Sequence, residues 1–143
     1  MNRRAAGLAA LVALLALGVL ASAHPGVRFV DIVSFSARAR DLAAGLPARD
    51  GLYPLGYPSV LVLGHAVVGD VLPFAKLAAV LAASALVALV AGRWGVLAGA
   101  WILVQVPTLQ WGSTEGTDMV AASLSIAAVV VSRHGMTAGL CVG

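Results

Sequence analysis

All six carboxylates of the chain lie in two short windows, one from Asp31 to Asp70 and the other from Glu115 to Asp118. The long hydrophobic runs contain none, as expected of segments in a bilayer, where a buried acid costs several kcal/mol. At a membrane surface, carboxylates can act as a general base or as oxygen ligands of a divalent cation. If both windows lie on the same side of a membrane, they form one acidic surface site.

The composition of the 143-residue chain is that of a membrane protein. Hydrophobic residues make up 61% of it and the mean hydropathy is +0.99, which leaves too little polar surface to cover a soluble globule. The basic residues are scattered singly, unlike those of a nucleic-acid-binding face. The single cysteine, Cys141, excludes an intramolecular disulfide and a cysteine-based metal site. We therefore expect an all-α polytopic membrane protein that contacts membrane lipid and binds no nucleic acid.

Four hydrophobic runs, at residues 5–23, 71–92, 94–111 and 119–132, are candidates for transmembrane helices. About 20 apolar residues span the roughly 30 Å hydrocarbon core of a bilayer. The first run also fits a secretory signal peptide, with cleavage after Ala23. Pro107 is expected to kink the third run.

The positions of the arginines predict how these hydrophobic runs are oriented across the membrane. Cytoplasmic loops carry an excess of Lys and Arg, which places Arg3, Arg4, Arg93 and Arg133 in the cytoplasm if the short apolar run at residues 59–69 lies in the interface. Both acidic windows are then outside. If the run at residues 59–69 were counted as a span, Arg93 would lie outside and the two acidic windows would lie on opposite faces of the membrane. We therefore expect a plasma (inner) membrane protein with a cytoplasmic N-terminus.

Residues 24–70 form the long external loop of this topology. Apolar residues recur at near-helical spacing over residues 29–43, with Arg38 among the polar residues between them, which predicts an amphipathic juxtamembrane helix. Gly45 is expected to end that helix with a positive φ. Asp31 lies in its first turn, either as a helix cap or as a functional carboxylate.

Two Tyr-Pro pairs, beginning at Tyr53 and Tyr57, follow in this loop. Each proline removes a backbone donor and biases its tyrosine toward extended geometry, so a rigid, turn-rich loop is expected over residues 50–58. The tyrosines suit an aromatic belt at the interface, or a surface that stacks on a sugar ring or a lipid. His65, on the short apolar helix that follows, is either a partnered interfacial histidine or a functional acid or ligand.

The second acidic window is a hydrophilic turn that opens the last apolar run. Asp118 or Thr117 can cap that helix, but capping does not account for Glu115 as well. Glu115 and Asp118 together are a candidate site for a divalent cation, Mg²⁺ or Mn²⁺, or for a base beside a phosphate leaving group. The sequence contains no Gly-rich phosphate loop and no nucleophile elbow, which argues against soluble hydrolase or nucleotidase chemistry.

The order of these parts resembles the GT-C membrane glycosyltransferases, in particular the branch with protein O-mannosyltransferases and the lipid A aminoarabinose transferase. The matching segments are FVD at 29–31, DLAAGLP at 41–47, GLYPLGYPSVLVLGHAVVG at 51–69, STEGTDM at 113–119 and GMTAGLCVG at 135–143. The resemblance implies a transferase that uses a polyprenyl-phosphate-linked sugar donor on the non-cytoplasmic face of the membrane.

The resemblance also implies residue roles. Asp31 matches the first-loop acid taken to be the general base that activates the acceptor, and Asp118 is similar in placement to a second-loop acid that assists the donor phosphate or a metal. Positive charge must stabilise the departing phosphate, for which Arg38 and Lys76 are candidates. Further candidates for donor or acceptor binding are Glu115, Tyr53, Tyr57 and His65.

Two departures from the family pattern bear on these roles. Many members carry an Asp-Glu pair in the first loop, whereas Ile32 follows Asp31 here, which leaves the acceptor class open. Family members are also much longer, so we expect an N-terminal piece of a longer enzyme that need not be active alone. The alternative is a small non-enzymatic integral membrane protein, such as an assembly subunit or a piece of a transporter, whose acids serve only as caps and headgroup contacts.

Overall fold

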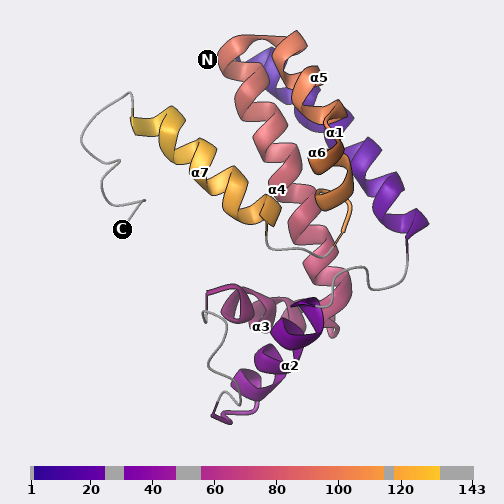
Figure 1. Ribbon diagram of the computed structural model, residues 1–143, viewed down its shortest axis with the longest axis vertical. Helices are drawn as coiled ribbons and strands as arrows, with labels where there is room; N and C mark the ends of the chain where they lie inside the picture. Colours follow the sequence, from indigo (N-terminus) through magenta and orange to yellow (C-terminus); the bar gives the residue numbers. More distant parts are fainter. Residues whose placement is uncertain (1, 25–30, 48–55, 115–117, 133–143) are drawn as a thin grey trace.

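The computed structural model of the protein describes residues 2–24, 31–47, 56–114 and 118–132, and all regular structure in these segments is α-helical. The expected all-α class is thus confirmed. Figure 1 shows a bundle of helices with a smaller pair of helices at one end. The helices are α1 (Arg3–Ala23), α2 (Asp31–Ala43), α3 (Gly56–Val68), α4 (Val71–Trp94), α5 (Val96–Val104), α6 (Val106–Trp111) and α7 (Asp118–Ser132).

The centre of the bundle is an antiparallel pair formed by α1 and α4. The Asn2 N–H donates to the Gly92 carbonyl at 2.8 Å at one end of the pair. Small residues let the two backbones approach closely: Ala9 and Ala13 of α1 share a core cluster with Ala91 of α4. Toward the end of α1 the two helices diverge (Figure 1).

Helices α1 and α4 are each long and apolar enough to cross a membrane. A core helix of a soluble protein would bury its apolar side chains, whereas only 22% of the most apolar stretch of α1 is buried. Large hydrophobic side chains on its outer face are exposed, including Leu8, Leu15 and Val19. An exposed apolar face of this size suits lipid and not water.

The third hydrophobic run differs from the expected kinked span. Helix α5 ends at Val104, Gln105 is extended with φ −64° and ψ 136°, and α6 begins at Val106. The break has a local cause, because Pro107 lacks the N–H that would bond to the carbonyl four residues earlier and its ring clashes with that turn. The run is therefore two short helices and not one.

The end of α6 reaches only the middle of α4. A Cβ placed on Gly112, the residue after α6, would lie 2.7 Å from the Cβ of Ala83. The expected span would instead have ended beside the first residues of α4. Helix α7 then starts beside the same part of α4, with Met119 buried against it, and diverges from it along its length (Figure 1).

Helices α2 and α3 form a unit, called here the α2–α3 unit, that packs on the first turns of α4. Its core joins all three helices and consists of Ile32, Phe35, Ala39, Leu61, Val71 and Ala75. Contact with α4 is close, because a Cβ on Gly64 would lie 2.0 Å from the ring of Phe74. The α2–α3 unit is thus fixed to the end of α4 that lies opposite Arg93.

The end of α2 follows the sequence prediction. Gly45 has a φ of 67°, the Leu46 N–H donates to the Asp41 carbonyl at 2.8 Å, and the Gly45 N–H donates to the Leu42 carbonyl at 3.1 Å. These are the two bonds of a Schellman motif, which a glycine accommodates without a Cβ penalty.

The second Tyr-Pro pair is a correction to the expected loop. Tyr57 and Pro58 lie in the first turn of α3, where a proline is tolerated because its missing N–H has no helical partner in any case. The first pair, with Tyr53, lies outside the described residues.

Candidate functional site

The structure distributes the predicted site residues over three places along α4. Asp31, Arg38, Tyr57 and His65 belong to the α2–α3 unit at its N-terminal end. Lys76 lies on α4 itself, in its second turn. Asp118 begins α7 beside the middle of α4. Tyr53, Glu115 and the side chain of Asp118 lie outside the described residues.

Asp31 is the first residue of α2 and is exposed. The next residue, Ile32, is 2% exposed and packs in the core of the α2–α3 unit. Packing of Ile32 therefore holds the adjacent backbone of Asp31 in place, while Asp31 itself is exposed. An acidic residue in the first turn of a helix is favourable, and this position suits a cap and a general base equally well.

Arg38 lies on the opposite side of α2 from the one predicted. It is 8% exposed, because it follows Phe35 by three residues and so shares the face that α2 turns toward α3. Arg38 is thus part of the interior of the α2–α3 unit, and the binding of a phosphate by its side chain stays a sequence prediction.

Tyr57 is half-buried and packs with Phe35 of α2. The two ring centroids lie 5.5 Å apart with an interplanar angle of 82°, an edge-to-face pair, which is a favoured aromatic geometry. The Tyr57 ring thus helps to hold α3 against α2, and its stacking on a sugar or a lipid stays a sequence prediction. His65 is exposed in the last turn of α3, where a basic residue is favoured by the helix dipole.

The start of α2 lies at the N-terminal end of α4 and the start of α7 beside its middle, so the two are not adjacent. Ile32 shares a core cluster with Ala75, and Met119 shares one with Ala83. The first cluster takes Val71 and Ala75 from α4 and the second takes residues from Val80 to Val90, so the two lie at different levels along the helix. Within the described segments no three potential His, Cys, Asp or Glu ligands come together, so the cation site at Glu115 and Asp118 stays a sequence prediction.

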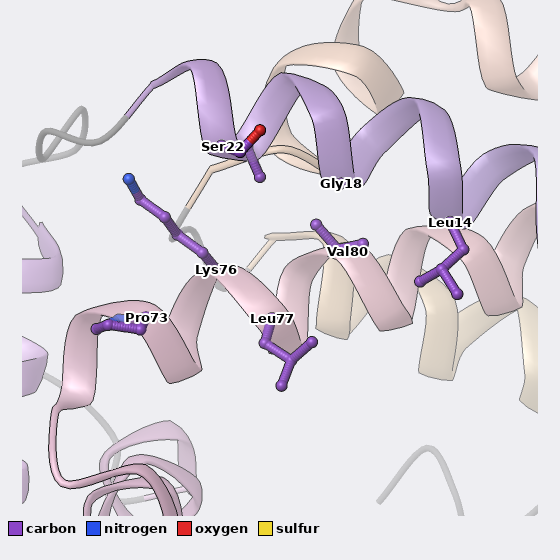
Figure 2. Close-up of a pocket in the computed structure, with 8 residues that line it drawn as sticks. Leu14, Gly18, Ser22, Pro73, Lys76, Leu77 and Val80 are labelled. Carbon is purple, nitrogen blue, oxygen red and sulfur yellow. The ribbon is translucent and has the colours of Figure 1, made fainter.

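A groove between α1 and α4 was not predicted from the sequence. It has a volume of about 340 Å³ and lies where the two helices diverge (Figure 2). Its walls are apolar, with Leu14 and Gly18 on α1 and Leu77 and Val80 on α4. Gly18 widens it, since a Cβ there would meet nothing within 4 Å.

Two polar side chains, Ser22 and Lys76, lie at the end of this groove that is formed by the last turn of α1 and the first turns of α4. Figure 2 shows the Lys76 side chain extending toward the end of α1, where its ammonium donates to the carbonyl of His24. The Ser22 hydroxyl donates to the Val19 carbonyl at 2.8 Å. The groove thus combines an apolar channel with a cation at one end.

A sequence signal for the groove exists, although it is weak. Leu14, Gly18 and Ser22 are four residues apart and so share one face of α1. Lys76 is the lone charge in residues 71–92. That these two features face each other depends on how α1 and α4 cross, which the sequence does not reveal.

None of the protein-family models, curated proteins and solved structures compared with the chain matches it.

Proposed function

We propose that this chain carries acidic residues of the active site of a membrane glycosyltransferase. The enzyme transfers a sugar from a polyprenyl-phosphate donor to an acceptor on the extracytoplasmic face of the inner membrane. The observation that supports this most is that neither acid-bearing helix start lies at the Arg93 end of α4: Asp31 lies at the opposite end and Asp118 beside the middle.

The segregation of charge along the α1–α4 pair supports the orientation. Arg3 and Arg4 begin α1 at the end where Asn2 bonds to Gly92, next to Arg93. Basic residues at one end and acids toward the other fit the positive-inside rule with the α2–α3 unit outside. The N-terminus is then cytoplasmic.

In this proposal Asp31 is the general base. Its carboxylate takes the proton of the acceptor as the acceptor attacks the sugar, and the bond from the sugar to the lipid phosphate breaks. An exposed acidic residue whose backbone is held in place by the packing of its neighbour suits this role, because an acceptor can approach it at a fixed position. Asp118, with Glu115, is assigned to the donor side, either directly or through a divalent cation.

The test is sugar transfer by membranes that contain the Asp31→Asn variant. Membranes from cells that produce the full protein receive a radiolabelled polyprenyl-phosphate sugar, and label in the acceptor fraction is measured. We expect a loss of about a hundredfold or more, the contribution of a general base. Asp41→Asn, the same charge change at the other end of α2, is the matched control and should keep its activity.

Undiminished transfer by the Asp31→Asn variant would refute the assignment of the base. Absence of transfer by the unchanged protein with any polyprenyl-phosphate sugar would favour the alternative, a non-enzymatic integral membrane protein.

A further inference from the structure

We propose that the groove between α1 and α4 binds an anionic phospholipid of the surrounding bilayer. One acyl chain lies along the apolar walls, and the lipid phosphate is held by the Lys76 ammonium. This role is independent of sugar transfer, and it differs from the donor or acceptor binding predicted for Lys76 from the sequence.

The depth of Lys76 in the membrane fits a lipid phosphate. Lys76 and Arg93 are the two charged residues of α4, and they lie about 26 Å apart along the helix axis. That separation is close to the roughly 30 Å thickness of a hydrocarbon core. If Arg93 lies among the headgroups of the cytoplasmic leaflet, the Lys76 ammonium lies at or just below the headgroups of the other leaflet, where it can meet a lipid phosphate.

The walls of the groove fit a hydrocarbon chain. From Leu14 to Ser22 the α1 wall extends about 12 Å, and its volume of about 340 Å³ accommodates a chain segment. Leu14 is 39% exposed and Leu77 is 46% exposed, so the groove opens on the outer surface of the helix pair, where lipid lies. The apolar lining of the groove continues into the lipid-facing surface of the helix pair. Such a lining favours a membrane lipid, because a free anion has no acyl chain to place against it.

The charge at the outer end of the groove selects an anionic lipid. Lys76 provides a full positive charge and Ser22 a hydroxyl, and among the described residues no carboxylate lines the groove. An ammonium group carries several donors and can hold the His24 carbonyl and a phosphate oxygen together. A basic residue near a membrane surface strengthens binding to an anionic lipid by about fivefold.

The experiment is native mass spectrometry of the full chain, released from micelles that contain equal amounts of phosphatidylglycerol and phosphatidylcholine. We expect the unchanged protein to retain phosphatidylglycerol about five times more than phosphatidylcholine. Lys76→Met should abolish the preference, while Lys76→Arg should keep it. Retained preference in Lys76→Met would overturn the proposal.

A second pair of variants tests the groove itself. Gly18→Leu fills the groove and should reduce retention of both lipids, whereas Gly7→Leu, on the same helix where a Cβ also meets nothing within 4 Å, should not. Equal retention by the two variants would overturn the assignment of the chain to the groove. Displacement of the lipid by inorganic phosphate, or much stronger retention of a polyprenyl phosphate, would overturn the assignment to a phospholipid. Equal helix content by circular dichroism establishes that the variants are folded.

Discussion

At the residue scale, two serines of α7 that look alike in the sequence have different partners. The Ser123 hydroxyl donates to the Ala82 carbonyl of α4 at 2.6 Å, whereas the exposed Ser125 hydroxyl donates at 2.9 Å to the Ala121 carbonyl of its own helix. Only the first bond joins two helices. Such bonds stabilise helix association in an apolar environment, where few other partners exist.

Ser123→Ala is therefore expected to destabilise the protein by about 1 kcal/mol. Ser125→Ala should change the stability by less than about 0.5 kcal/mol, as is usual for exposed sites. The measurement is the midpoint of thermal unfolding in detergent, followed by circular dichroism. Equal midpoints for the two variants would show that the bond between α7 and α4 contributes nothing.

At the element scale, the contact of α5 with α4 depends on a glycine. A Cβ on Gly99 would lie 2.6 Å from the Cβ of Ala91 and 3.2 Å from the Val87 carbonyl oxygen. Both neighbours belong to α4, and the closest contacts involve its backbone and a short side chain that cannot rotate away. Any larger residue must therefore push α5 outward.

Gly99→Ala is expected to destabilise the protein by about 1–3 kcal/mol, the usual cost of overpacking. Gly7→Ala, on the outer face of α1, has space and should be neutral or stabilising, because alanine favours helix. Denaturant titration of the two variants measures the difference. The close packing of α5 on α4 would be contradicted if Gly99→Ala were as stable as Gly7→Ala.

The elements that the sequence predicted well are those fixed by local signals. The end of α2 was predicted from Gly45. The start of α4 matches the start of the hydrophobic run at residue 71, and the structure adds its cap, since the Asp70 carboxylate accepts from the Leu72 N–H at 3.2 Å. The break at Gln105 was less predictable, because a proline can kink a long helix or divide it. The sequence analysis missed that Pro58 belongs to α3, because a proline is tolerated in the first turn of a helix but breaks a helix in its interior.

The candidate site was predicted less completely than the helices. The first-turn position of Asp31 was anticipated, since it depends on helical periodicity alone. The burial of Arg38 was not, because it depends on which face of α2 meets α3. The groove beside Lys76 needs two helices distant in the sequence to diverge, and no local pattern encodes that.

At the scale of the whole molecule, the proposed topology places both acidic windows on one side of the membrane. The described helices support it for Asp31, through the position of the α2–α3 unit at the end of α4 opposite Arg93, whereas α7 starts beside the middle of α4. Arg93 and Trp94, at the other end of α4, are then cytoplasmic.

Cysteine labelling of intact cells tests this arrangement in a Cys141→Ala background. A membrane-impermeant maleimide should label Leu46→Cys and Gly116→Cys from outside, and it should label Trp94→Cys only after permeabilisation. Labelling of Trp94→Cys in intact cells, or of only one of the other two, would contradict the proposal that both windows share a face.

The short reach of α6 has an electrical consequence. Gly112 lies beside Ala83, which is about 10 Å along α4 from Lys76. The potential across a membrane changes over its low-dielectric thickness and is worth about 2.3 kcal/mol per elementary charge for each 100 mV. With Lys76 near the headgroups, a charge that moves to the level of Gly112 crosses part of that drop. Ionic chemistry at this depth would respond to the membrane voltage, while chemistry at the level of Lys76 would not.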